Sequence, residues 1–235
     1  MKVLTLQLQT GSSYKDNLKR LCKIIEESHA ELIVVPELAL TDFDYEHFND
    51  VADFYEVALQ KLLELVSHKV VVLTMTKKEP KGFVNQAVVI HNHKVIHRQN
   101  KYKLFTLGDE TKYFKAGEID KIVSFEIEGV KYGLLICFEL RFKELWKKLE
   151  GVDIVLIPAR WGKSRKKHLE VLSQALAIMN QCFVVVSNSA DDDMASSSAI
   201  ISPWGDVVMD DSAELIEKEI LLKEVKKVRR MVSMR

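Results

Sequence analysis

Short, uninterrupted apolar runs are the feature of this sequence that most restricts its fold. They occur at residues 32–35, 154–157 and 183–186, and the first two lead directly into Pro36 and Pro158. A strand buried on both faces reads as such a run, whereas a strand with one face in water alternates apolar and polar residues. Proline ends a strand because it has no N–H to donate to the ladder. The runs therefore predict central strands of a sheet that is covered on both faces.

Amphipathic segments lie between these runs. The segment after Ser13, a capping residue, places Leu18, Leu21, Cys22 and Ile25 on one face at helical spacing. Residues 51–65 and 163–180 have the same periodicity, and a short helix is expected at 142–149. Alternating strands and helices predict an α/β sandwich, and without a repeat or a composition break we expect a single domain, residues 1–235. The further strands expected are Lys2–Leu8, Lys69–Thr74, Gly82–His91, Lys94–Arg98, Lys121–Ile127, Val130–Cys137 and Val152–Ile157.

Composition excludes several classes of function. Lys and Arg together number 34, as do Asp and Glu, so no net charge attracts nucleic acid or an anionic membrane. No apolar run approaches the ~20 residues of a membrane span. The N-terminus alternates like a strand and lacks the features of a signal peptide. With three widely spaced cysteines, a disulfide framework is not expected, and we predict a reduced, cytoplasmic protein.

A cysteine ends one of the predicted core strands. Cys137 follows the run 133–136, and the charged residues Glu139 and Arg141 come directly after it. A reactive side chain is often placed at a corner between a strand and a helix, but a free cysteine is more commonly a small buried hydrophobe. Cys22 and Cys182 lie within a helical face and a strand, so packing accounts for both.

Two other strand ends carry polar groups that a thiol nucleophile could use. Glu37 follows Pro36, although a glutamate after a strand is ordinarily solvated, and the corner 158–161 follows another strand. A thiol needs a base and a group that stabilises the oxyanion. Histidine is the usual base, and the sequence does not exclude His168. The residues by themselves do not choose between these partners.

Three segments resemble the signatures of the nitrilase superfamily of carbon–nitrogen hydrolases, in the order in which that family has them. They are Val34–Leu38, Lys101–Phe105 and Leu135–Phe142. The resemblance implies a four-layer α-β-β-α sandwich and a catalytic triad of Glu37, Lys101 and Cys137. It also implies that Glu110 supports the site, while Ser197–Gly205 is similar to a late segment of the family.

The chemistry that the resemblance implies is amide hydrolysis through a Cys thioester with release of ammonia. Lys101 would lower the thiol pKa, and Glu37 would act as the base. Lys101 and the backbone N–H of Phe138 would form the oxyanion hole. No metal or organic cofactor is expected.

The segment Pro158–Trp161, with His168 downstream, resembles the omega-amidase-like branch, whose substrates are small amides of 2-oxo dicarboxylic acids. An N-carbamoyl amino acid amidohydrolase is the alternative activity, and a non-catalytic binding protein on the same fold is the alternative of a different class. Arg141 is a candidate for the substrate carboxylate, or it pairs with Glu139 as a structural residue. Trp161 forms a pocket wall or part of the core. Phe43 and Tyr45 are candidates for the entrance.

Several positions depart from the family pattern or invite other interpretations. Glu139 stands where the family mostly has aspartate, and Leu176 and Met179 replace an arginine and a glutamate. These replacements bear on local packing or on the dimer surface more than on catalysis. The family commonly dimerises, so a homodimer is expected. His91, His93 and His97 could cluster on a hairpin, but no cysteine or carboxylate completes a metal site. The basic segment 223–235 lacks the interleaved aromatics of a nucleic-acid site.

Overall fold

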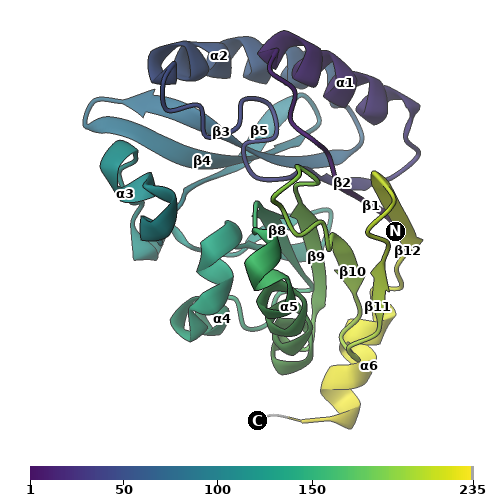
Figure 1. Ribbon diagram of the computed structural model, residues 1–235. Helices are drawn as coiled ribbons and strands as arrows, with labels where there is room; N and C mark the ends of the chain where they lie inside the picture. Colours follow the sequence, from purple (N-terminus) through teal and green to yellow (C-terminus); the bar gives the residue numbers. More distant parts are fainter. Residues whose placement is uncertain (234–235) are drawn as a thin grey trace.

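In the computed structural model, which describes residues 1–233, the strands form two six-stranded sheets that pack face to face (Figure 1). In pairing order, the first sheet contains β12 (Leu215–Glu219), β1 (Lys2–Leu6), β2 (Leu32–Val34), β3 (Val70–Glu79), β4 (Gly82–His91) and β5 (Lys94–Asn100). The second contains β11 (Val207–Met209), β10 (Ala199–Ile201), β9 (Phe183–Asn188), β8 (Ile154–Ala159), β7 (Val130–Leu134) and β6 (Phe125–Ile127).

Helices cover the outer face of each sheet (Figure 1). The α-helices are α1 (Tyr14–Glu27), α2 (Phe48–Leu65), α3 (Glu110–Tyr113), α4 (Lys143–Lys148), α5 (Lys166–Asn180) and α6 (Lys223–Met231). Helices α1 and α2 pack on the first sheet, where Leu21 and Leu62 share a core with Ile33. Helices α4 and α5 pack on the second sheet. The predicted four-layer α-β-β-α sandwich is therefore confirmed.

The buried runs lie where their composition predicts. Strand β2 pairs in parallel with β1 and β3, and β8 pairs in parallel with β7 and β9. Such strands are covered on both faces, which explains why their sequences do not alternate. One core contains Val34 and Val72 of the first sheet together with Leu134 and Leu156 of the second. The two sheets are thus held against each other by apolar burial.

Several predicted boundaries are wrong at strand ends. The strand predicted to reach Cys137 ends at Leu134, and a 3₁₀-helix spans Cys137–Arg141. The predicted strand 121–127 is paired only at Phe125–Ile127. Conversely, β5 continues to Asn100 and so delivers Lys101 at its end. Within 1–233, no helix is both long and apolar enough to span a membrane.

The basic C-terminal segment forms α6, whose Val225 and Val228 are buried against the rest of the protein. Its last two residues, 234 and 235, lie outside the described part of the chain.

Candidate active site

Glu37 is fully buried, so the expectation that a glutamate after a strand is solvated is wrong here. Its backbone N–H donates to the carbonyl of Ala159 at 3.1 Å, which ties the end of β2 to the end of β8 in the other sheet. Oε1 accepts hydrogen bonds from Asn85 Nδ2 at 2.8 Å and Lys101 Nζ at 2.7 Å. Among residues 1–233, the buried Oε2 has no partner with good hydrogen-bond geometry, and the Glu37 carboxylate lies close enough to the Cys137 thiol to interact with it.

Lys101 is also fully buried, between two carboxylates. Its Nζ lies 2.7 Å from Glu37 Oε1 and 2.6 Å from Glu110 Oε1. Burial opposes the charge on Lys101, but Glu37 and Glu110 outweigh it and raise its pKa above the ordinary value. The second oxygen of Glu110 accepts from the backbone N–H of Phe105 at 3.1 Å, which fixes this carboxylate. The Lys101 ammonium is therefore held in its charged form and in place by two carboxylates.

Cys137 begins the 3₁₀-helix that follows β7, and it adopts a left-handed backbone conformation with φ of 51°. A residue other than glycine costs energy in this conformation, so surrounding contacts must hold it. Glu139 supplies one such restraint, because its carboxylate accepts from the backbone N–H of Ile136 at 2.7 Å. The same carboxylate accepts from the N–H of Tyr102 at 2.7 Å. Glu139 thus joins the cysteine turn to the segment that carries Lys101.

The sequence-based expectation that Lys101 would leave Cys137 with a lowered pKa is wrong. Burial raises the pKa of this thiol well above its ordinary value, Glu37 raises it further, and the opposing effect of Lys101 is smaller. The resting thiol is therefore protonated, and a base must take its proton during attack. Glu37 is the candidate, because its carboxylate interacts with the thiol and lines the same cavity. The backbone N–H of Arg160 donates to Sγ at 3.4 Å.

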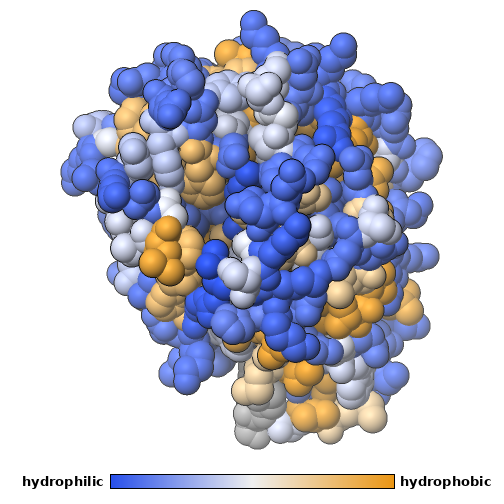
Figure 2. Space-filling model, viewed as in Figure 1, coloured by the Kyte–Doolittle hydropathy of each residue, from blue (hydrophilic) through white to orange (hydrophobic). Residues whose placement is uncertain are grey.

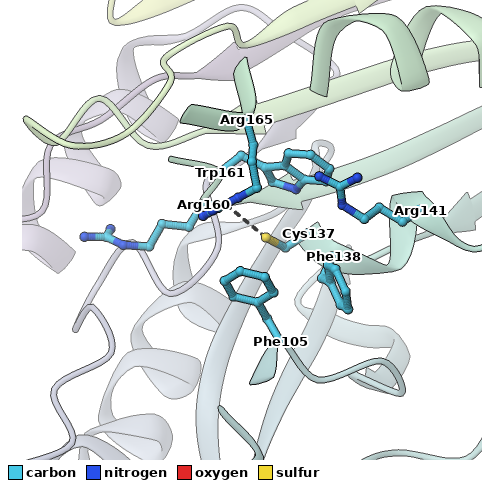
Figure 3. Close-up of a pocket in the computed structure, with 7 residues that line it drawn as sticks. All are labelled: Phe105, Cys137, Phe138, Arg141, Arg160, Trp161 and Arg165. Atoms are coloured by element: carbon cyan, nitrogen blue, oxygen red, sulfur yellow. Dashed lines mark hydrogen bonds between the residues drawn. The ribbon is translucent and has the colours of Figure 1, made fainter. Parts of the chain in front are cut away.

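Two adjoining cavities open on Sγ. Figure 3 shows the first, lined by Phe105, Cys137, Phe138, Arg141, Arg160, Trp161 and Arg165. The second, of about 390 Å³, also contacts Glu37, Glu110 and Phe43. The thiol, the glutamate with the free oxygen and a set of guanidinium groups therefore meet in one space. This arrangement suits attack by sulfur on a small, polar acyl compound.

Of the remaining predicted residues, some line the cavities and one does not. Trp161 is buried and forms a wall, and Phe43 lines the second cavity, as expected. Tyr45 lines neither: its ring stacks on Tyr113 at 3.9 Å, and its hydroxyl donates to the carbonyl of Gly108. Tyr45 therefore braces the loop beside the entrance. Phe138 follows Cys137 in the first turn of the 3₁₀-helix, where backbone N–H groups lack partners within the helix.

Arg141 does not pair with Glu139, so that structural alternative is wrong. Its Nη2 lies 2.9 Å from Nδ1 of His168, and its guanidinium stacks on Trp161, with Cζ 4.6 Å from the ring centroid. Arginine can only donate, so Nδ1 of His168 is the acceptor. His168 is exposed and hydrogen-bonded to Arg141 rather than to the thiol, so Glu37 is the candidate base that lines the same cavity as Cys137.

Sequence reasoning named the corner 158–161 as a candidate strand end but did not single out Arg160, and it missed Arg165. Arg160 directly follows β8, where the rule that ligands bind at the ends of strands places it. It forms ion pairs with Asp42 at 2.7 Å and Asp191 at 2.6 Å. Arg165 has no comparable signal, because its position depends on how α5 packs against the second sheet.

The hairpin histidines point to separate partners. Nδ1 of His91 lies 3.2 Å from the carbonyl of Lys69, and Nδ1 of His93 lies 2.9 Å from that of Leu63. The ring of His97 stacks on Phe125. Over residues 1–233, the structure contains no cluster of three side chains that could hold a metal ion.

Comparisons with known proteins agree with this geometry. The pattern of the carbon–nitrogen hydrolase family matches residues 4–230. The chain is 32% identical to the 2-oxoglutaramate amidase of Bacillus subtilis, over 96% of this chain and 93% of that protein. It is 25% identical to omega-amidase NIT2 of Mus musculus, over 98% of this chain and 92% of that protein.

Solved structures share the fold. A CN-hydrolase superfamily protein from Xanthomonas campestris, XC1258, matches with a TM-score of 0.88 at 19% identity, covering 99% of this chain and 94% of that one. A mutant amidase from Nesterenkonia sp. AN1, which carries acrylamide added to its active-site cysteine, matches with a TM-score of 0.85 at 17% identity. That match covers 99% of this chain and 98% of the amidase.

Proposed function

Because the chain belongs to the carbon–nitrogen hydrolase family, we propose that it hydrolyses the ω-amide of a small 2-oxo dicarboxylic acid, with Cys137 as the nucleophile. The observation that carries the assignment is the buried ammonium of Lys101, held by Glu37 and Glu110 beside a thiol and an unpartnered carboxylate oxygen. The amidase names of the two relatives support the substrate class.

In the proposed reaction, Sγ of Cys137 attacks the amide carbon while Glu37 Oε2 takes the thiol proton. Nζ of Lys101 and the backbone N–H of Phe138 stabilise the negative oxygen of the tetrahedral intermediate. Glu37 passes the proton to the nitrogen, the C–N bond breaks, and ammonia leaves a thioester. Glu37 then takes a proton from water, whose oxygen attacks the thioester. Collapse releases the carboxylic acid and returns the proton to sulfur.

The raised pKa of Cys137 determines how the first step must proceed. A thiol that is neutral at rest cannot attack until its proton moves, so attack and proton transfer are coupled through Glu37. Arg141 supports the choice of an amide with a carboxylate, because its guanidinium faces the cavity of Cys137 and forms bidentate pairs with such groups.

The test is ammonia release from 2-oxoglutaramate, 2-oxosuccinamate and N-carbamoyl-β-alanine, measured side by side. We expect the first two to be hydrolysed, the third to be poor, Cys137→Ala to be inactive and Glu37→Gln to lose about 10²–10⁴-fold in kcat. Cys22→Ala is the matched control. Ammonia release by Cys137→Ala at the native rate would refute the mechanism, and a preference for the carbamoyl compound would refute the substrate class.

Exposed apolar side chains support a homodimer as part of this proposal. They lie on α5, on the turn between β10 and β11, and on β11, and Figure 2 shows hydrophobic surface over the end of the molecule that carries β11 and α6. They are Ile178, Met179, Trp204, Val207 and Met209. Water contact with such a group of side chains is unfavourable, and a second copy related by a two-fold axis would remove it.

The cysteines support a cytoplasmic location, which we propose on that ground. Cys22, Cys137 and Cys182 are all buried, and none is in a disulfide. A nucleophilic thiol also requires a compartment that keeps it reduced.

A further inference from the structure

Two arginines face the cavity above the thiol from different segments. Arg141 lies in the 3₁₀-helix of Cys137, and Arg165 immediately precedes α5. Both line the cavity that contains Sγ, and Figure 3 shows their side chains on the same side of Cys137, with Trp161 between them. The fold therefore brings two positive charges to the place where the acyl part of a substrate must lie.

Among the described residues, neither of these guanidinium groups has a counter-ion. Within residues 1–233, no carboxylate oxygen lies at ion-pair distance from Arg141 or Arg165. Arg160 in the same cavity differs, because Asp42 and Asp191 both pair with it. The protein thus neutralises one arginine of the cavity and leaves the other two available.

Aromatic rings hold the two unpaired side chains in position. Cζ of Arg141 lies 4.6 Å from the centroid of Trp161, and Cζ of Arg165 lies 4.9 Å from the centroid of Phe105. His168 also accepts one N–H of Arg141. Arg165 donates one long hydrogen bond, from Nη1 to Oγ of Ser164 at 3.5 Å. Stacking and these two hydrogen bonds orient the planar groups and leave most of their N–H donors unused.

Keeping these cations together without an anion is unfavourable. Burial lowers the pKa of Arg141, and repulsion from Arg165 lowers it further, so the two charges act on each other. Like charges near a protein surface repel, and a bound anion would convert this repulsion into attraction for both. A carboxylate has two oxygens with about four lone pairs, enough for two guanidinium groups.

We propose that Arg165 is a second carboxylate-binding residue, which with Arg141 selects amides that carry an anionic end over neutral amides. This inference rests on the proposed amidase function and adds a specificity-determining residue to it. Arg165 takes no part in bond breaking. It acts on binding, by holding the carboxylate while the amide carbon lies at Sγ.

The test compares the best anionic amide of the preceding assay with its neutral methyl ester, following ammonia from both. We expect Arg165→Met to raise KM for the anionic amide about 10- to 100-fold, with kcat changed less than about 3-fold, because a charge-assisted hydrogen bond is lost. The neutral ester should keep its kcat/KM, and Arg165→Lys should recover part of the loss. Lys167→Met removes the same charge from the exposed start of α5 and should change neither.

Equal losses for the anionic and neutral amides in Arg165→Met would show a structural role and overturn the inference, as would no loss for either. A binding measurement separates failure of the inference from failure of the proposed function. Calorimetry with 2-oxoglutarate on the inactive Cys137→Ala protein should show at least tenfold weaker binding when Arg165→Met is added. If no amide is hydrolysed but Arg165→Met still weakens 2-oxoglutarate binding, the proposed amidase activity is refuted and the proposed carboxylate-binding role of Arg165 is supported. Unchanged binding refutes the site.

Discussion

Glu139 illustrates how one buried side chain can hold an active site together without touching the reacting atoms. Its carboxylate accepts backbone N–H groups from Ile136 and Tyr102, which belong to the segments that carry Cys137 and Lys101. The side chain has no exposure to solvent. Burial raises its pKa from the ordinary 4.5 to about 7, although both N–H groups favour the charged form. Holding the charged carboxylate of Glu139 in this buried position therefore lowers the stability of the fold.

That cost predicts a pH dependence of stability. Because the folded pKa of Glu139 is the higher one, folding takes up a proton between about pH 4.5 and 7. The free energy of unfolding should fall as pH rises through this window, by about 3 kcal/mol from this group, and level off above it. Glutamine at position 139 cannot titrate. The free energy of unfolding of Glu139→Gln, relative to the wild type, should therefore rise by about 3 kcal/mol between about pH 4.5 and 7. Urea unfolding at pH 5, 6, 7 and 8 measures it, and a constant difference would contradict the assignment.

At the scale of elements, the position of Lys101 depends on how the end of β5 meets Gly117. The N–H of Gly117 donates to the carbonyl of Lys101 at 2.8 Å. A Cβ at position 117 would lie 2.3 Å from the carbonyl oxygen of Asn100, so no other residue fits without moving the strand end. The backbone contact thereby sets where the ammonium stands between its two carboxylates.

Gly117→Ala should therefore displace Lys101 and lower kcat by about 10²-fold, since a misplacement of ~1 Å costs this much. Gly129→Ala is the matched control: Gly129 has a positive φ in the β6–β7 turn, and open space surrounds it. It should destabilise the fold by about 1 kcal/mol and leave kcat unchanged. Steady-state kinetics with urea unfolding on both variants tests this. Equal kinetic effects would mean that the contact at Gly117 does not position the lysine.

At the scale of the whole molecule, the site exists because two sheets pack together. Glu37 and Lys101 follow strands of the first sheet, whereas Cys137 and Arg160 follow strands of the second. The hydrogen bond from Glu37 to Ala159 and the bridge made by Glu139 both cross this boundary. Loss of inter-sheet packing would separate the nucleophile from its base.

The proposed homodimer makes a prediction at the same scale. Ile178→Glu places a charge on an exposed apolar position of α5 and should shift the protein from dimer to monomer, because burying an unpaired charge at an interface is strongly unfavourable. Val57→Glu introduces the same charge at a comparably exposed apolar position of α2, on the opposite layer, and should leave the dimer intact. Light scattering during size-exclusion chromatography measures the mass. A monomeric wild-type protein would refute the dimer.

Apolar periodicity predicted most of the elements, because burial on one or both faces determines which residues a helix or strand tolerates. The ends of strands next to the candidate active site were less predictable. The run 133–136 reads as a strand up to Cys137, yet pairing ends at Leu134, since backbone hydrogen bonding rather than hydrophobicity decides where a strand stops. Resemblance to a family indicated Glu37, Lys101 and Cys137, which the fold brings together.

The sequence by itself determined the layered α/β fold and the types of residue available for chemistry. Only the tertiary structure decided how those residues behave, because pKa values and ion pairing depend on burial and on neighbours distant in sequence. It raised the pKa of the Cys137 thiol, gave Arg160 two acidic partners and left Arg141 and Arg165 with none among residues 1–233. The packing of one sheet on the other brings together charges that are distant along the chain. A local sequence pattern cannot predict such contacts.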